Sequence, residues 1–224
     1  MPDQNRLIDT IAVIGGTGKE GGGLALRWAH HGYPVLIGSR SLEKAQAAAA
    51  EMNATLGKDS VLGLANADAA AQAGIVVFTV PYTSRQETLD SIREQVQGKV
   101  FVDVSVPIQP PNFTVATLPP GRTAAEETQA FLGQAVRVVS AFQNVSAIHL
   151  KKLDSAIDCD VLICSDDEDA KQIAMTLADA AGMRGIDGGP LANAIVAEAL
   201  TPLLLGLNKR YGVKGVGVRF TGLP

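Results

Sequence analysis

The sequence has few of the residues that build metal centres, disulfides or aromatic surfaces. Its 224 residues include two cysteines, three histidines and 4% aromatic residues. Cys159 and Cys164 lie in one predicted strand, where their odd spacing points the two side chains to opposite faces. That arrangement suits neither a shared metal nor a disulfide, so we expect two buried thiols and no metal site.

Positive charge and long apolar runs are also scarce. The 19 Lys and Arg residues are scattered and outnumbered by 23 Asp and Glu residues, which gives a net charge of −4 at pH 7. Nucleic-acid binding depends on clustered basic residues, so we expect no nucleic-acid partner. No apolar run approaches the roughly 20 residues that span a bilayer, and residues 1–6 lack the apolar segment of a secretory signal. The sequence predicts a cytoplasmic protein without a membrane segment.

Short apolar runs alternate with helical patterns along most of the chain. The runs are continuous and rich in β-branched residues, which is typical of parallel strands buried on both faces. Strands are predicted over 11–14, 35–37, 61–64, 75–79, 100–104 and 136–139, and helices over 19–30, 42–52, 67–73, 84–96 and 124–132. This pattern predicts an α/β fold with a Rossmann-type doubly wound parallel sheet of about six strands.

The pattern starts again after residue 147, with a strand over 161–163 and helices over 167–181 and 191–208. We therefore predict two domains, a Rossmann domain over 1–147 and a smaller C-terminal α/β domain over 148–224. Five prolines within 107–120 predict a loop there. The last helix is apolar nearly all round and must be buried against something, so we expect a homodimer. The alternative is that this helix packs within its own domain.

A glycine-rich turn follows the first predicted strand and leads directly into a helix. It contains the spacing Gly16-x-Gly18-x-x-Gly21, in the context that a dinucleotide-binding turn requires. We assign Gly16 to the tight turn, Gly18 to close approach of a pyrophosphate and Gly21 to helix–strand packing. The helix N-terminus and the Thr17 hydroxyl offer donors to the anion. The predicted binding residues of this turn are Gly16, Thr17, Gly18, Lys19, Glu20 and Gly21.

The end of the second predicted strand indicates which dinucleotide binds. An enzyme that prefers NAD carries a carboxylate here for the ribose 2′-hydroxyl, whereas this chain has Ser39 and Arg40. Arg40 can bind a 2′-phosphate through paired charged hydrogen bonds, and Lys44 lies one helical turn further on. We predict NADP as the cofactor. The alternative is that Arg40 and Lys44 only solvate the start of a helix.

Groups that usually carry proton chemistry are missing. The short-chain dehydrogenase mechanism requires a Tyr-x-x-x-Lys pair. No tyrosine of the chain has a lysine at that spacing, whether Tyr33, Tyr82 or Tyr211, so this mechanism is excluded. The three histidines are interpreted as structural, and the acidic residues 166–169 as a helix cap. With no catalytic acid or base, we expect hydride exchange with a flat flavin-like ring, where catalysis consists mainly of orientation.

Several motifs together resemble one family. They are the turn over 14–21, Ile37-Gly-Ser-Arg40 with Lys44, Phe78-Thr-Val-Pro81, Val139-Ser-Ala141, Asp187-Gly-Gly-Pro-Leu191 with Asn193, Glu198-Ala-Leu-Thr-Pro-Leu203 and Gly215-Val-Gly-Val-Arg-Phe220. In order and spacing the sequence resembles the NADPH-dependent coenzyme F420 reductases along nearly its whole length. The resemblance implies reversible hydride transfer between NADP(H) and the deazaflavin coenzyme F420, with both small-molecule coenzymes as partners.

The resemblance also implies where each coenzyme binds. The adenosine phosphate end of NADP would lie at Thr17, Gly18, Ser39, Arg40 and Lys44, and the nicotinamide half beside Val80 and Pro81. The deazaflavin would lie near Gln143, Asn144, Val145, Ser146, Thr201 and Val216. Some archaeal members have histidine at the position of Gln143, and Gln143 can donate a hydrogen bond to a ring carbonyl but cannot titrate.

Two other functions fit parts of the same pattern. One is an NADPH-dependent reductase whose acceptor is a flavin or a ferric complex. The other is a redox sensor that binds NADP without turnover, as proteins with a similar glycine turn do. The long apolar helix with Thr201 is explained more readily by an acceptor site or a dimer interface than by a sensor.

Overall fold

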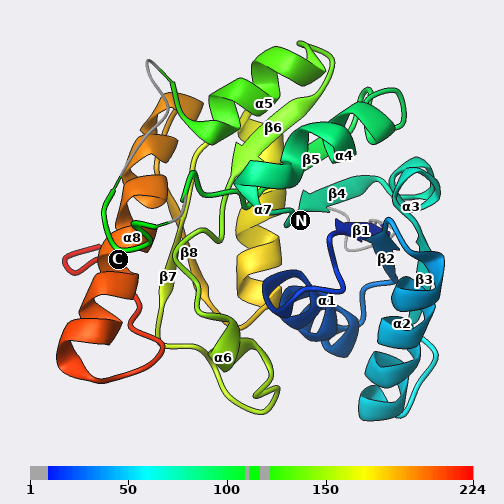
Figure 1. Cartoon of the computed structure of the whole chain (residues 1–224), viewed down its shortest axis with the longest axis horizontal. Helices are drawn as coiled ribbons and strands as arrows, with labels where there is room; N and C mark the ends of the chain where they lie inside the picture. Colours follow the sequence, from blue (N-terminus) through cyan, green and yellow to red (C-terminus); the bar gives the residue numbers. More distant parts are fainter. Residues whose placement is uncertain (1–9, 109–110, 117–121, 224) are drawn as a thin grey trace, which may run out of the picture.

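The computed structural model describes residues 10–108, 111–116 and 122–223, and its centre is a six-stranded parallel sheet (Figure 1). The strands are β1 (Ile11–Ile14), β2 (Val35–Ser39), β3 (Val61–Ala65), β4 (Ile75–Phe78), β5 (Val100–Asp103) and β6 (Arg137–Ser140). Their spatial order is β3-β2-β1-β4-β5-β6, the Rossmann order. The predicted fold is confirmed. Successive strands are added in one direction from β1 to β3 and in the other from β4 to β6, so the strand order reverses between β1 and β4.

Helices cover both faces of this sheet, which explains its almost wholly apolar strands. The helices are α1 (Lys19–His31), α2 (Leu42–Leu56), α3 (Asn66–Gln72), α4 (Arg85–Ile92), α5 (Ala124–Leu132) and α7 (Glu168–Ala180). Residues of α1, α2 and α7 share one apolar cluster with the sheet, and residues of α3, α4 and α5 share the other. The sheet is therefore buried on both sides, as its continuous apolar strands predicted.

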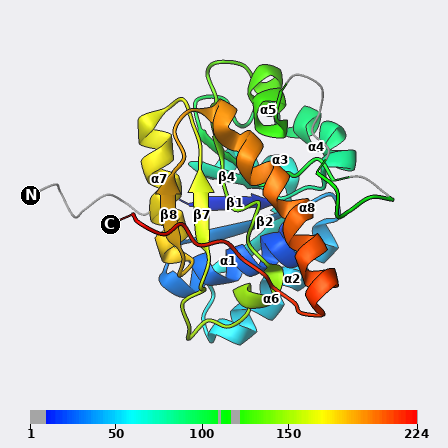
Figure 2. The same ribbon diagram turned by 90° about the vertical axis from the view of Figure 1, so that its left-hand side faces the viewer.

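The C-terminal part adds a second, two-stranded parallel sheet of β7 (Asp160–Ile163) and β8 (Arg184–Asp187). An antiparallel bridge between Ser140 and Cys164 connects β7 to β6. The remaining elements are the short helix α6 (Ala147–Leu150), the 3₁₀ turn η2 (Leu191–Asn193) and α8 (Ala194–Tyr211). Figure 2 shows the segment after α8 running back beside β7, where Val218 O accepts a bond from Asp160 N.

Side chains of α1 join the regions before and after residue 147. The indole N–H of Trp28 donates to Leu177 O in α7 at 2.8 Å. Arg27 is 5% exposed and donates only to main-chain carbonyls, those of Leu150, Ala181, His149, Lys152 and Ser155. Apolar residues from both regions belong to one cluster. The C-terminal segment is thus held against the sheet by its own core packing.

A few predicted elements differ in detail. The predicted helix 84–96 is a 3₁₀ turn η1 (Tyr82–Ser84) followed by α4, after which turns bring Val96 into the core. Strand β8 was not predicted, because its sequence Arg-Gly-Ile-Asp has a single large apolar residue. Part of the predicted loop 107–120 lies outside the described residues, and so does the whole of residues 1–6.

Helix α8 and the turn before it pass a length and hydropathy test for a membrane span that the search for uninterrupted apolar runs did not detect. Leu191–Tyr211 is long enough to cross a membrane and has a mean hydropathy of 1.4, with 33% buried. Glu198, in the middle of this stretch, is 1% exposed and accepts bonds from the N-terminus of α5. Through this contact α8 packs against α5 of the same chain. The absence of a membrane segment stays a prediction.

Candidate functional site

The turn between β1 and α1 is shaped by four glycines with different constraints. Gly15 has φ +83°, a conformation that side chains rarely adopt. A Cβ on Gly16 would lie 2.8 Å from Val13 O, and one on Gly21 would lie 2.3 Å from the Thr79 hydroxyl. Gly18 has only Gly15 O nearby, at 3.3 Å. The tight turn therefore requires Gly15 for its positive φ and Gly16 for its close contact with Val13 O, so Gly15 joins the glycine that we assigned to the turn.

A cavity of about 600 Å³ opens above this turn, at the carboxyl ends of β1, β2 and β4. This is the position at the chain reversal where Rossmann folds bind ligands. Ten of the predicted residues line it: Thr17, Gly18, Lys19, Glu20, Gly21, Ser39, Arg40, Lys44, Val80 and Pro81. Gly16 is buried and does not line it. The cavity also includes Gly15, Ser41, Asn66, Thr79, Ser84 and Thr88, which sequence reasoning missed.

One end of the cavity carries the positive charge. Arg40 follows β2, and Lys44 lies in the first turn of α2, whose N-cap Ser41 accepts a bond from Lys44 N at 3.3 Å. Glu87 of α4 lies 3.8 Å from the Arg40 guanidinium, and both side chains are exposed, at 82% and 71%. An exposed pair of this kind is weak, so Arg40 remains available to an anion. Glu87 could not be found from the sequence pattern, because it belongs to a helix that follows β4.

Glu20 brings a buried carboxyl group into the same cavity. It stands in the first turn of α1, and its Oε1 is enclosed without a hydrogen-bond partner among the described residues. Burial raises the pKa of Glu20 to about 8. Near neutral pH this side chain is therefore mostly uncharged, and it can donate as well as accept a hydrogen bond.

The residues predicted to contact the deazaflavin begin just after β6, at a strained turn. Phe142 has φ +72°, and its ring packs edge-on against Trp28 with centroids 5.7 Å apart. The next residue, Gln143, is 4% exposed and donates from Nε2 to Asp103 O and Ser140 Oγ, both at 2.8 Å. Both amide hydrogens are thus engaged within the protein. Donation from Gln143 to a ring carbonyl, which the resemblance allows, would require Nε2 to leave Asp103 O or Ser140 Oγ, whereas Oε1 has no partner among the described residues.

The other predicted deazaflavin residues lie around this turn. Asn144 and Val145 are buried, at 3% and 7% exposure, and Asn144 donates to Asp160 O at 2.8 Å. Thr201 of α8 donates to Gln143 O at 2.7 Å, and Val216 N donates to Asn208 in α8 at 3.1 Å. The structure therefore brings Gln143 and Thr201 into contact and ties Val216 to the same helix. None of these residues lines the 600 Å³ cavity.

A second cavity, of about 400 Å³, lies beside this group. Ser146, His149, Lys152, Cys159, Gly215 and Gly217 are among its lining residues. His149 Nε2 lies 2.9 Å from Gly215 O, in keeping with the structural role predicted for it. Cys159 and Cys164 are both free and buried, as predicted.

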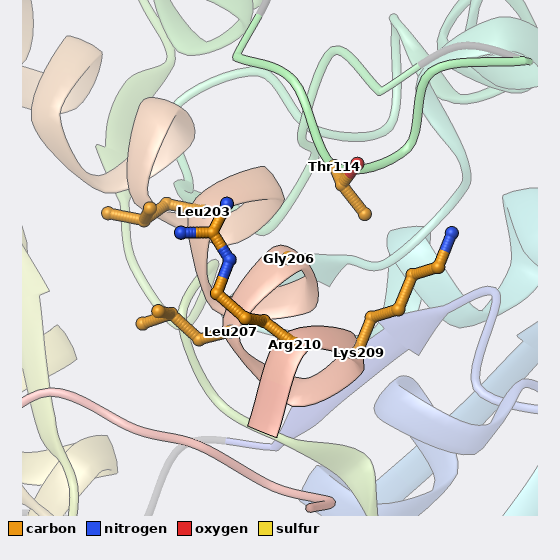
Figure 3. Close-up of a pocket in the computed structure, with 6 residues that line it drawn as sticks. All are labelled: Thr114, Leu203, Gly206, Leu207, Lys209 and Arg210. Carbon is orange, nitrogen blue, oxygen red and sulfur yellow. The ribbon is translucent and has the colours of Figure 1, made fainter. Parts of the chain in front are cut away.

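A third cavity, of about 430 Å³, lies on the outer side of α8 (Figure 3). Thr114 faces Gly206 across it, and Leu203, Leu207, Lys209 and Arg210 complete its lining. In Figure 3, Arg210 extends toward Leu203 and Lys209 extends to the other side of the helix. None of these residues was among the predicted coenzyme-binding residues.

Buried ionisable groups link β5, α4, α5 and α8 beneath the site. Asp103 accepts bonds from Ser105 N at 2.8 Å and Thr128 Oγ1 at 2.6 Å, and it lies 4.0 Å from the Arg85 guanidinium. Glu198 accepts bonds from Ala124 N and Ala125 N at the start of α5. Burial raises the pKa of Glu198 to about 7, against the lowering effect of these two N–H groups. Both carboxyl groups have partners in the protein, so neither is placed as a free catalytic acid.

The fold, the glycine turn and the cavity at the β1/β4 reversal define a Rossmann-type dinucleotide-binding protein. The family model described as "NADP oxidoreductase coenzyme F420-dependent" matches residues 10–107. The F420-dependent NADP reductase of Methanothermobacter thermautotrophicus is 46% identical over 226 residues, which cover 97% of each chain. The enzyme of the same name from Methanocaldococcus jannaschii is 41% identical over 95% of this chain and 98% of its own.

The chain is also similar to a solved structure, that of a candidate F420-dependent NADP reductase from Arthrobacter sp. FB24. It superposes with a TM-score of 0.79 at 28% identity, covering 95% of this chain and 99% of that one. The chain belongs to the family of F420-dependent NADP reductases, and the resemblance seen in its motifs is confirmed.

Proposed function

We propose that this chain catalyses reversible hydride transfer between NADP(H) and coenzyme F420. The observation that carries the proposal is the 600 Å³ cavity at the β1/β4 reversal, with Ser39, Arg40 and Lys44 at one end and Val80 and Pro81 also in its lining. Its family relatives, at 41–46% identity, have the corresponding name. A flavin or ferric acceptor, or binding without turnover, is not favoured by these relatives.

The cavity suits NADP in charge and in shape. Gly18 leaves room beside the N-terminus of α1, whose N-cap makes no side-chain bond, so its main-chain N–H groups are open to a pyrophosphate. Ser39, Arg40 and Lys44 supply donors and positive charge for the 2′-phosphate. Val80 and Pro81, directly after β4, would lie against the nicotinamide half. Asn66, Ser84 and Thr88 add polar groups to the same lining.

We place the deazaflavin beside Gln143, Asn144, Val145, Ser146, Thr201 and Val216. This placement is supported by a chain of hydrogen bonds that connects the proposed nicotinamide residues to the proposed deazaflavin residues. Ser105 Oγ lies 3.5 Å from Val80 O, and Ser105 N donates to the Asp103 side chain. The main-chain carbonyl of Asp103 in turn accepts a bond from Gln143. Gln143 Oε1 and Asn144 Oδ1 are buried acceptors without partners among the described residues. A ring with N–H groups would satisfy such acceptors.

The two coenzymes supply the hydride chemistry when they are bound. The chain would supply orientation: the Thr201–Gln143 bond fixes α8 against the turn after β6, and the strained backbone of Phe142 sets the direction of Gln143 and Asn144. The buried apolar residues around Val145 would keep water from the rings. No residue is assigned as catalytic acid or base.

We also propose the larger organisation of the molecule. Residues 1–147 would bind NADP, and residues 148–224 would complete the deazaflavin cleft and form a homodimer. Helix α8 supports the dimer, because Ile195, Val196, Leu203 and Leu205 are between 39% and 52% exposed on it. Two free buried cysteines suit a reducing compartment, so we place the protein in the cytoplasm.

An anaerobic absorbance assay tests the proposed reaction. Purified protein is mixed with NADPH and oxidised coenzyme F420, and the loss of the visible absorbance of the deazaflavin is followed. FMN and ferric citrate are run in parallel. We expect rapid loss with coenzyme F420 alone. Loss with FMN or iron alone would identify another acceptor, and NADPH binding without loss in any sample would indicate a sensor.

A further inference from the structure

Glu20 places a carboxyl group at a helix N-terminus that is proposed to bind an anion. It lies two positions after the N-cap Gly18 of α1, in the first turn of the helix that faces the cavity. A dinucleotide at this helix N-terminus brings a pyrophosphate with two negative charges. An ionised Glu20 would place a further negative charge beside them.

No described side chain is paired with the carboxyl group of Glu20. Its Oε1 is enclosed without a partner, and among the described residues Glu20 forms no hydrogen bond or ion pair through its side chain. Burial alone accounts for its raised pKa of about 8. Burial raises the thiol pKa of Cys159, the Val218 backbone lowers it, and the charges of Asp160, Asp158 and Glu20 raise it to a smaller degree.

The charged groups around the cavity are few and can be named. They are Lys19 on α1, Arg40 and Lys44 at β2 and α2, and Glu87 on α4, with Asp158 and Asp160 beyond Cys159. The basic groups are exposed on their helix or strand ends, and Arg40 is paired with Glu87 at 3.8 Å. A bound dinucleotide would therefore meet Glu20 in a cavity where none of these cations forms an ion pair with it.

We propose that Glu20 couples coenzyme binding to a proton: NADP(H) binds to the form in which the Glu20 carboxyl group is neutral, and binding takes up a proton when that group is ionised. The inference rests on the proposed placement of NADP in the cavity. The protonated carboxyl group can donate a hydrogen bond to a phosphate oxygen or to the nicotinamide carboxamide, which an ionised one cannot. Glu20 acts here as a specificity residue, not as a catalytic acid.

The test is the dissociation constant of NADPH, measured by fluorescence titration between pH 7 and pH 9. In this range the ionisation of the 2′-phosphate changes only from about nine-tenths to complete, since its second pKa is about 6. With a free pKa of about 8, wild-type affinity should fall about tenfold from pH 7 to pH 9. Glu20→Gln keeps the shape and removes the titration, so its affinity should change less than about twofold.

Two controls locate the effect. Glu94→Gln, at an exposed position outside the site, should keep the full pH dependence of the wild type. Adenosine 2′-monophosphate, which lacks the pyrophosphate and nicotinamide, should bind wild-type protein with the same affinity at pH 7 and pH 9. Equal pH slopes for NADPH in wild type and Glu20→Gln would overturn the proposal, as would an adenosine 2′-monophosphate affinity that falls as steeply as that of NADPH.

A measurement on the wild type alone avoids any dependence on the folding of a variant. Calorimetric titrations with NADPH at pH 8, in buffers of different ionisation enthalpy, report the protons taken up. We expect about half a proton per site, and no uptake would overturn the proposal. Arg40→Ala separates this inference from the proposed function. If Arg40→Ala leaves NADPH binding intact, the placement of NADP fails; if only the pH effects are missing, the role of Glu20 fails.

Discussion

The hydroxyl of Thr201 in α8 donates a 2.7 Å hydrogen bond to the carbonyl of Gln143, 58 residues earlier in the chain. This bond joins the last helix to the strained turn after β6. It is made to the main chain, so the position of the turn depends on it whatever the side chain of residue 143 is. The contact connects two of the segments predicted to hold the deazaflavin.

Thr201→Val should weaken deazaflavin binding without affecting NADPH. Loss of the donor leaves a carbonyl without its partner, which costs about 1–3 kcal/mol, and a tenfold rise in KM for coenzyme F420 corresponds to about 1.4 kcal/mol. Steady-state kinetics and NADPH titration check this. Thr176→Val, which removes an exposed bond to Gln172 O within α7, is the matched control. Equal weakening of both coenzymes would argue against the placement of Thr201.

Arg40→Ala should weaken NADPH far more than NADH. The variant removes a charged hydrogen bond to the 2′-phosphate, worth about 1.5–3 kcal/mol, and NADH has no such phosphate. Dissociation constants for both dinucleotides test this. Arg93→Ala, whose guanidinium stacks on Phe131, changes an arginine that lines none of the described cavities. A similar loss for NADPH and NADH would show that Arg40 does not recognise the phosphate.

Two glycine variants should separate binding from stability. Gly18 has an ordinary φ of −77° and its nearest atom is 3.3 Å from an added Cβ, so Gly18→Val should fold while its side chain blocks the pyrophosphate. Gly21→Ala places a Cβ 2.3 Å from Thr79 Oγ1 and should lose about 1–3 kcal/mol of stability. Urea denaturation and NADPH titration of both variants check the contrast. NADPH binding retained by Gly18→Val would refute the placement of the turn.

The strand order, the glycine turn and most of the cavity lining followed from local patterns. Continuous apolar strands and the turn residues act through neighbours in sequence, so Arg40, Lys44 and Val80 could be placed in advance. Asn66 and Thr88 could not, because they reach the cavity from helices whose orientation depends on packing, and the same holds for Glu87, which lies beside Arg40. The engagement of Gln143 by Asp103 O was equally hidden, since a hydrogen bond between residues 40 positions apart leaves no sequence pattern.

The buried Glu198 should make stability depend on pH between about 4.5 and 7. Its pKa is raised to about 7 in the folded protein, from a usual value of 4.5. The folded state therefore holds a proton that the unfolded state releases, and stability falls as pH rises through this window. Glu198→Gln lacks this slope, so the stability advantage of the wild type should shrink from pH 4.5 to pH 7. Denaturation series at several pH values test this; parallel curves would contradict it.

Helix α8 should carry the dimer contact. Leu203→Glu puts a charge on a side chain that is 52% exposed on its outer face, and we expect the protein to become monomeric. Leu62→Glu, at 54% exposure on β3, is the matched control and should stay dimeric. Light scattering after size-exclusion chromatography gives both masses. A monomeric wild type would remove the proposed dimer, and a dimeric Leu203→Glu would move its contact elsewhere.

Trp28 gives this protein a built-in optical probe. It is the single tryptophan of the chain, fully buried, with its N–H on Leu177 O and its ring against Phe142. Its emission therefore responds both to the attachment of α7 and to the turn that carries Gln143. Any loosening of the C-terminal half should shift the fluorescence before the parallel sheet itself opens, so one unlabelled signal can follow the integrity of both halves of the site.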